Sequence, residues 1–191
     1  TIYNEAENKG FLRHIYIRKA AQTHEIMVCL VINGDFLPES EALVEELQNI
    51  CGDNLKSLQI NINKKDTNVI LGDKYRTLWG EDRLEETLCG ITFRLSVPSF
   101  YQVNRDQAEK LYTRAVDYAG LTGSELVLDL YCGAGTITQV MAQKAGKVIG
   151  AEIVAPAIED AKQNAQRNKI ENAEFFCGDA ADIAAKLEKE G

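Results

Sequence analysis

The sequence predicts a mixed α/β chain in two parts, with a domain boundary after residue 97. In residues 1–97, several strand-like runs surround one helix-like run, a pattern typical of α+β domains with a mainly antiparallel sheet. In residues 98–191, apolar strand-like runs alternate with longer helix-like runs, which indicates the start of a parallel β-α-β arrangement.

Hydrophobic periodicity places the elements of the first part. Residues 10–20 alternate in polarity and residues 25–33 are almost continuously apolar, so we expect two strands joined as a hairpin through residues 22–24. Pro38 begins a helix, and its glutamates are expected to form a solvated face. Residues 55–63 form a further strand. Short strands are expected at residues 69–71, 75–79, 84–88 and 91–97.

The second part begins at Pro98, which ends the preceding strand because proline cannot donate to a sheet ladder. Asn104 can cap the helix that follows it. Strands are expected at residues 126–130, 147–151 and 173–177. Helices are expected at residues 105–118, 136–145, 155–168 and 180–190.

A glycine turn follows the first strand of the second part. Residues 129–136 read Asp-Leu-Tyr-Cys-Gly-Ala-Gly-Thr, and Gly133 and Gly135 let the backbone bend sharply and approach a ligand closely. The next strand ends at Glu152, where a carboxylate accepts hydrogen bonds from ribose hydroxyls in nucleotide-binding units. Thr138 replaces the third glycine of the dinucleotide pattern, which argues against NAD. Taken alone, a Gly-x-Gly pair is equally compatible with a plain turn.

The complete string is more specific, because it resembles the first motif of S-adenosylmethionine-dependent methyltransferases. Its Tyr-Cys-Gly version resembles the RNA uracil carbon-5 methyltransferase family, which makes 5-methyluridine in ribosomal and transfer RNA. Residues 99–104, Ser-Phe-Tyr-Gln-Val-Asn, resemble the loop that enters the methyltransferase domain of this family. Residues 12–14, Leu-Arg-His, resemble the opening of its central domain, although His14 is also explained as a half-exposed strand residue.

The resemblance implies an RNA-contacting central domain at residues 1–97. It implies at residues 98–191 the truncated N-terminal part of a Rossmann-like class I methyltransferase domain that binds S-adenosylmethionine. The cofactor-binding residues would be Gln102, Tyr131, Gly133, Gly135, Thr136, Glu152 and Asp179. Thr136 is the weaker candidate, and Asp179 is equally explained as a helix cap.

The chemistry of the family uses a cysteine thiolate that adds to carbon 6 of a flipped uridine, which activates carbon 5 for methylation. In the family this cysteine belongs to a later motif, so we expect it C-terminal to Gly191 and predict that this segment is inactive. Cys132 lies in the cofactor loop and is not expected to be the nucleophile.

Composition limits the function classes. The formal net charge is −8, so an RNA partner, which the resemblance suggests is 23S rRNA, needs local basic groups such as Arg13, Arg18 and Lys19. No apolar run approaches the ~20 residues of a membrane span. The five cysteines form no Cys-x-x-Cys pair, so no metal site is expected here. The resemblance implies an iron–sulfur cluster only in a longer parent protein. Scattered cysteines favour a reducing, cytoplasmic compartment.

Two further expectations concern assembly and alternatives. The missing initiator methionine suggests a segment of a longer protein, and an unpaired first parallel strand would favour homo-oligomers or swapped dimers. The alternative functions are a Rossmann-fold methyltransferase acting on guanine, protein or a small molecule, and a non-enzymatic RNA-binding module.

Overall fold

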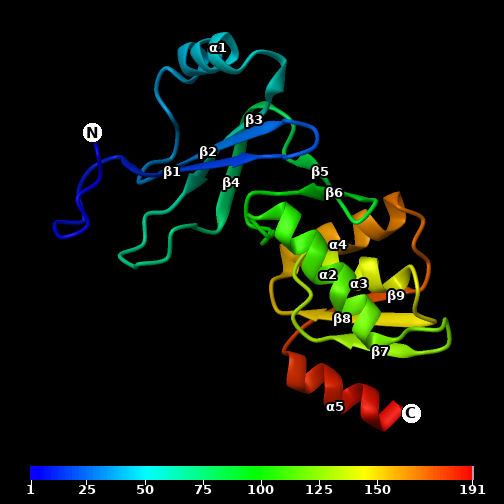
Figure 1. The fold of residues 1–191 in the computed structure, drawn as a ribbon. Coiled ribbons are helices and arrows are strands. Elements are labelled where there is room, and N and C mark those ends of the chain that lie inside the picture. Colours follow the sequence, from blue (N-terminus) through cyan, green and yellow to red (C-terminus); the bar gives the residue numbers. More distant parts are fainter. Residues whose placement is uncertain (191) are drawn as a thin grey trace. The chain divides into compact units, whose positions relative to one another are not determined.

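A computed structural model describes residues 1–190 (Figure 1). The chain forms two compact units, Thr1–Glu85 and Glu86–Gly191. The sequence placed this boundary after residue 97, at the end of a strand that the structure has at Ile91–Leu95. That strand lies in the second unit because its Arg94 is bonded to Asn164 of the helix Ala155–Arg167.

The first unit contains a four-stranded sheet in the order β1-β2-β3-β4. Two of its three pairings are antiparallel, β1 with β2 and β3 with β4, whereas β2 and β3 are parallel. This confirms the mainly antiparallel α+β prediction. The parallel pair is connected by α1 and the short 3₁₀ helix η1. The bounds are β1 Leu12–Lys19, β2 Ile26–Ile32, α1 Ser40–Cys51, η1 Gly52–Asn54, β3 Leu55–Ile62 and β4 Lys74–Gly80.

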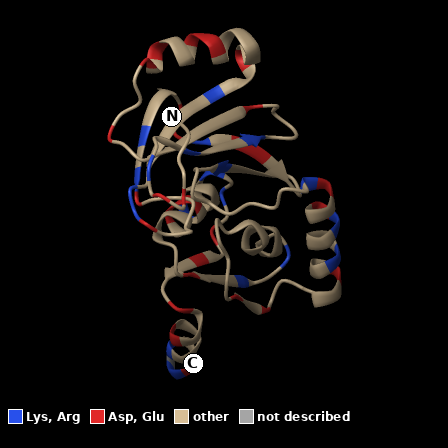
Figure 2. Ribbon diagram, turned by 90° about the vertical axis from the view of Figure 1, so that its left-hand side faces the viewer, with Lys and Arg blue, Asp and Glu red and all other residues tan. Residues whose placement is uncertain are grey.

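The core of the first unit lies between the sheet and α1, which covers one face of the sheet (Figure 1). Alternate residues of the two central strands are buried there, and α1 packs Leu43, Val44 and Leu47 against them. The glutamates of α1 are exposed, as predicted, and no basic residue interrupts them (Figure 2). His14 is half-buried on β1, with its Nε2 4.0 Å from Glu5 Oε1, which agrees with the strand explanation.

The strand expected at residues 69–71 is wrong. Side-chain amides take the place of a ladder there, because Asn63 Nδ2 donates to the carbonyl oxygens of Val69 (2.7 Å) and Ile70 (3.0 Å). Asn61 likewise accepts from the N–H of Gly72 at 2.7 Å. The apolar run is therefore held as an irregular loop, and sequence periodicity does not reveal such side-chain partners.

The second unit begins within β5, whose hairpin with β6 is closed by Cys89 and Gly90 with φ of 50° and 78°. Two positive φ angles in a two-residue connection are typical of a type I′ turn. A three-stranded sheet follows, in the order β7-β8-β9, with both pairings parallel. The bounds are β5 Leu84–Leu88, β6 Ile91–Leu95, α2 Arg105–Ala119, β7 Leu126–Asp129, α3 Thr136–Ala142, β8 Lys147–Glu152, α4 Ala155–Arg167, β9 Ala173–Cys177 and α5 Ala180–Glu190.

These elements confirm the Rossmann-like arrangement. The sheet is covered by α3 and α4, whose small buried side chains pack with Val148 of β8 and Phe175 of β9. Every helix and strand expected in the second part is present, with bounds shifted by a few residues. No helix within residues 1–190 is both long enough and apolar enough to cross a membrane.

Candidate cofactor site

Parallel pairing brings three strand ends together at one edge of the sheet. Glu152 of β8 lies in register with Cys177 of β9, and β7 ends at Asp129, which pairs with Gly150. The following loops are tied to β8, because Cys132 N donates to Ala151 O and Gly178 N donates to Glu152 O, both at 3.0 Å. The predicted residues that follow these strands therefore belong to one edge of the sheet.

The glycine turn after β7 depends on both of its glycines, for different reasons. Gly133 and Gly135 have φ of 54° and 73°, in the left-handed region that side chains disfavour. A Cβ on Gly135 would lie 2.7 Å from the Phe175 ring, whereas a Cβ on Gly133 would meet nothing within 4 Å. Gly135 is therefore required by internal packing, and Gly133 leaves open space beside the loop.

Glu152 connects this turn to the end of β8. Its Oε2 accepts from the N–H of Gly133 at 3.2 Å, and its Oε1 accepts from the N–H of Val154 at 2.9 Å. The side chain is half-buried. A carboxylate held by backbone donors beside a glycine turn has a fixed direction, so it can accept hydrogen bonds from a diol at a defined position.

Asn104, predicted as a helix cap, and Asp179, predicted as a site residue, both cap helices. Asn104 accepts from the N–H of Gln107 at 3.2 Å, which confirms its cap on α2. Asp179 Oδ1 accepts from the N–H groups of Ala181 (2.8 Å) and Asp182 (3.3 Å) at the start of α5. The capping explanation of Asp179 is thus realised, and both bonds end on one carboxylate oxygen.

The other predicted residues differ in exposure. Tyr131 after β7 is 84% exposed and Ile153 after β8 is 69% exposed, so both offer apolar surface at the strand ends. Gln102 is half-buried in the loop before α2. Thr136 is buried, and its hydroxyl lies 3.2 Å from the hydroxyl of Tyr112, so its side chain has a structural partner in α2.

Asp129 is a site residue that the sequence reasoning did not identify. Burial raises the pKa of its carboxyl, and the charge of Glu152 adds to this increase, while a bond from Thr138 opposes it. That bond joins Thr138 Oγ1 to Asp129 Oδ2 at 2.6 Å. An acidic residue at the end of the first strand, followed by a threonine in α3, was the available signal.

Burial raises the pKa of the Cys132 thiol to about 12. A thiol with this pKa is protonated at neutral pH, and only the thiolate is a strong nucleophile. The geometry therefore agrees with the expectation that Cys132 is not a nucleophile.

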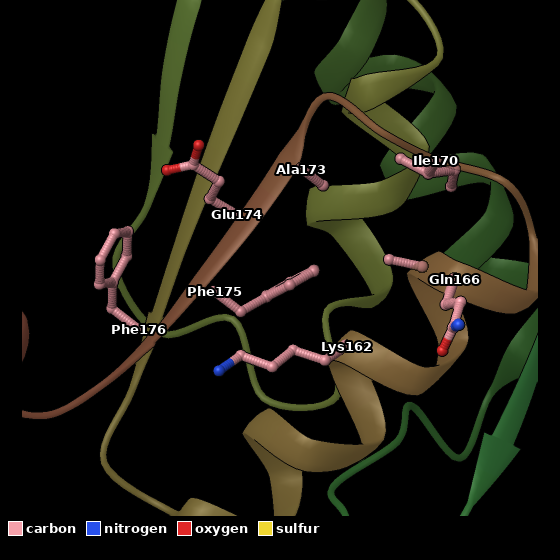
Figure 3. A pocket seen from close by; sticks show the side chains of 8 residues that line it. Lys162, Gln166, Ile170, Ala173, Glu174, Phe175 and Phe176 are labelled. Atoms are coloured by element: carbon pink, nitrogen blue, oxygen red, sulfur yellow. The ribbon is translucent and has the colours of Figure 1, made fainter.

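A shallow hollow of about 450 Å³ lies beside β9 and α4 (Figure 3). In Figure 3, Phe175 points toward α4 and Phe176 lies on the other side of the strand. None of the predicted cofactor residues lines this hollow, so it is separate from the candidate site. Within residues 1–190, no group of three or more His, Cys, Asp or Glu residues is arranged to hold a metal ion.

Comparison with known proteins identifies the class. Residues 121–191 match the family model described as a methyltransferase domain. An uncharacterized RNA methyltransferase of Clostridium acetobutylicum is 48% identical over 99% of this chain, which covers 41% of that protein. Another, from Staphylococcus epidermidis, is 44% identical over the whole chain, which covers 42% of that protein.

Solved structures agree on the fold. A Pyrococcus abyssi tRNA (uracil-54, C5)-methyltransferase in complex with S-adenosyl-L-homocysteine matches with a TM-score of 0.73 and 28% identity, over 92% of this chain and 41% of that one. Trm5b from the same organism matches with a TM-score of 0.53 and 21% identity, over 81% of this chain and 46% of that one, and shows the fold alone.

Residues 121–191 of the second unit are therefore similar to a methyltransferase domain. Over its whole length, the chain is similar to proteins named as RNA methyltransferases. It spans about two fifths of the length of those relatives.

The two glycines should respond differently to alanine. Gly133→Ala should lower the free energy of unfolding by about 1–2 kcal/mol, the cost of a side chain in the left-handed region. Gly135→Ala should lower the free energy of unfolding by the same amount and by about 1–3 kcal/mol more, because its Cβ overpacks against Phe175. Thermal denaturation followed by circular dichroism measures both, and equal losses of stability would contradict the packing explanation.

Proposed function

We propose that this chain is the cofactor-binding segment of an S-adenosylmethionine-dependent enzyme that methylates carbon 5 of a uridine in RNA. One observation carries the proposal: the half-buried Glu152 carboxylate is bonded to the Gly133 amide at the carboxyl edge of a parallel sheet. Ligands bind at this edge in open α/β folds. The similarity to a tRNA uracil-C5 methyltransferase complexed with S-adenosyl-L-homocysteine supports both the cofactor and the base.

The residues at the strand ends fit the proposed cofactor. Gly133 has open space beside it, so a ligand can come close to the protein backbone there. Glu152 would accept the ribose hydroxyls with the carboxylate lone pairs that its bonds to the Gly133 and Val154 amides leave unused. Tyr131 and Ile153 supply exposed apolar surface for a planar base, which is the usual lining of such sites. Gln102, Thr136 and Asp179 complete the proposed set.

The bound cofactor supplies a methyl group on a sulfonium. The chain's own residues would hold the nucleoside part of the cofactor and fix its direction. The nucleophilic cysteine of the proposed chemistry is expected C-terminal to Gly191, outside the described residues, so methyl transfer is assigned to the longer protein. In that reaction the carbon-5 hydrogen of uridine leaves as a proton and a carbon–methyl bond replaces it.

RNA is the proposed partner, and the first unit is proposed to contact it. The charged residues of α1 are all acidic, whereas β1 carries Arg18 and Lys19, and β4 carries Lys74 and Arg76 (Figure 2). Local basic strands are compatible with a chain of net charge −8. Arg13 has a structural role instead, because its guanidinium donates to the carbonyl oxygens of Asn63, Lys65 and Thr67.

Three finer assignments rest on the sequence alone, two of them on the motif resemblance and the cytoplasmic location on the scattered cysteines. They are 23S rRNA as the substrate, a cytoplasmic location, and an iron–sulfur cluster elsewhere in the longer protein. The structural neighbour is named for uracil-54 of tRNA, so a substrate experiment has to compare both RNA classes.

Glu152→Ala should weaken binding of S-adenosyl-L-homocysteine to residues 1–191 by about tenfold to hundredfold, because hydrogen bonds to a charged group contribute about 1.5–3 kcal/mol. Isothermal titration calorimetry measures the affinity. Glu159→Ala is the matched control, since Glu159 is exposed on α4 and bonded to Gln163.

The titration has two informative failures. If the wild type and Glu152→Ala bind S-adenosyl-L-homocysteine with equal affinity, Glu152 does not contact the cofactor. An absence of binding by the wild type, repeated with a chain extended beyond Gly191, would overturn the cofactor assignment.

Base specificity is measured by tritium release. A protein carrying this segment together with the C-terminal residues should release tritium to water from RNA labelled at carbon 5 of uridine, one atom per methyl group transferred. Transcripts of 23S rRNA and of tRNA are compared, with the rRNA expected to react. Methyl transfer without tritium release would indicate another target, such as guanine.

Within residues 1–190, β7 has a neighbouring strand on one side only, and its Leu126 and Leu128 are 60% and 44% exposed. An open apolar edge strand favours pairing with another chain, so residues 1–191 are proposed to dimerise through β7. Light scattering should show a dimer that Leu128→Lys converts to a monomer. A monodisperse wild-type monomer would contradict this proposal.

A further inference from the structure

Three polar residues spaced four apart lie along one side of α4: Asp160 and Asn164 are within the helix, and Asn168 is its C-cap. Residues four apart lie on the same side of a helix, one turn above another. Asp160 is 1% exposed and Asn164 is fully buried, so this face is inside the second unit. Buried polar groups require hydrogen-bond partners, and here the partners belong to β6 and the segment after it.

Asn164 and Asn168 bond to β6 as a neighbouring strand would. Asn164 accepts from the N–H of Arg94 at 2.7 Å and donates to its carbonyl oxygen at 3.1 Å. Asn168 accepts from the N–H of Thr92 at 3.2 Å and donates to its carbonyl oxygen at 2.8 Å. Each side-chain amide therefore supplies one donor and one acceptor to an alternate residue of the strand.

The spacing of the two elements makes this match possible. Four helical residues rise about 6 Å, and two strand residues advance about 6.6 Å. A side chain on every turn of α4 can therefore reach every second residue of β6. We call Asp160, Asn164 and Asn168 with their bonds to β6 the α4 ladder.

Asp160 extends the ladder beyond β6 into the loop before α2. Its Oδ2 accepts from the N–H of Ser96 at 3.2 Å and from the Ser96 hydroxyl at 2.7 Å. The same oxygen accepts a hydrogen bond from the hydroxyl of Ser99, which is 2% exposed. A carboxylate shared by three donors fixes the backbone of residues 96–99 in one position.

The loop is thus anchored at both ends. Ser99 is held by Asp160, and Asn104 caps α2 through the N–H of Gln107. Between these anchors, Phe100 and Val103 are exposed and Gln102 is half-buried. The anchored ends therefore determine where Gln102 lies.

The start of α4 also follows Glu152 directly, and Glu152 Oε1 accepts from the N–H of Val154, the residue that precedes the helix. One helix therefore connects the proposed ribose ligand with the loop of Gln102. We propose that Asp160 is a positioning residue, which sets the location of the Gln102 loop relative to the cofactor site. The proposal rests on the proposed cofactor role of Gln102.

The test is a double-mutant cycle in residues 1–191, with S-adenosyl-L-homocysteine affinity measured by calorimetry. Asp160→Asn and Ser99→Ala should each weaken binding by about tenfold, since each weakens a charge-assisted bond that holds the loop. In a chain that already carries Gln102→Ala, Asp160→Asn should have no further effect, because it acts through Gln102.

Asn168→Ala is the matched control. It removes bonds of the same ladder two helical turns from Asp160, so it should lower thermal stability and leave the affinity unchanged. Equal effects of Asp160→Asn and Asn168→Ala on affinity would reduce the ladder to a purely structural role. Full additivity of Asp160→Asn with Gln102→Ala would also overturn the proposal.

A second measurement does not depend on the cofactor. Chymotrypsin cleaves after exposed aromatic residues, and Phe100 of the loop is 69% exposed. Asp160→Asn and Ser99→Ala should accelerate cleavage there by about tenfold, whereas Asn168→Ala should not. If neither the wild type nor a chain extended beyond Gly191 binds S-adenosyl-L-homocysteine, the proposed function fails. Unchanged cleavage in Asp160→Asn would overturn the positioning role separately.

Discussion

Parallel pairing of β7, β8 and β9 is the constraint on which the candidate site depends. It directs three carboxyl ends to one edge of the sheet, so residues far apart in the chain meet there without long loops. The edge is then completed by backbone bonds from the residues after β7 and β9 to Ala151 and Glu152 at the end of β8. A shift in this pairing would separate the glycine turn from the carboxylate.

Packing behind the edge is as demanding as the edge itself. Phe175 occupies the space beneath two glycines, since a Cβ on Gly135 or on Gly150 would lie 2.7 Å or 2.9 Å from its ring. The turn after β7 can therefore approach β8 only because both positions lack side chains. A Cβ on Gly133, by contrast, would meet nothing within 4 Å, and the ligand is proposed to lie on this open side of the turn.

The α4 ladder joins two tasks that are usually separate. Its asparagine side chains bond the N–H and C=O groups of Thr92 and Arg94 on β6. These groups are therefore not available to pair with a strand of another chain. The ladder also anchors the loop that carries Gln102, because Asp160 receives the bonds of Ser96 and Ser99. This bonding explains why β6 belongs to the second compact unit although the sequence grouped it with the first.

The sequence alone determined the order of strands and helices, the glycine turn and the identity of Glu152, because periodicity and backbone-restricted residues are local properties. It failed at residues 69–71, where Asn61 and Asn63 replace a strand partner. Only the tertiary structure decided that Asp179 caps α5, that Asp129 is buried beside Thr138, and that Asp160 anchors a loop 61 residues earlier in the chain. These roles depend on which side chains meet across elements, and a single sequence does not encode that proximity in any local pattern.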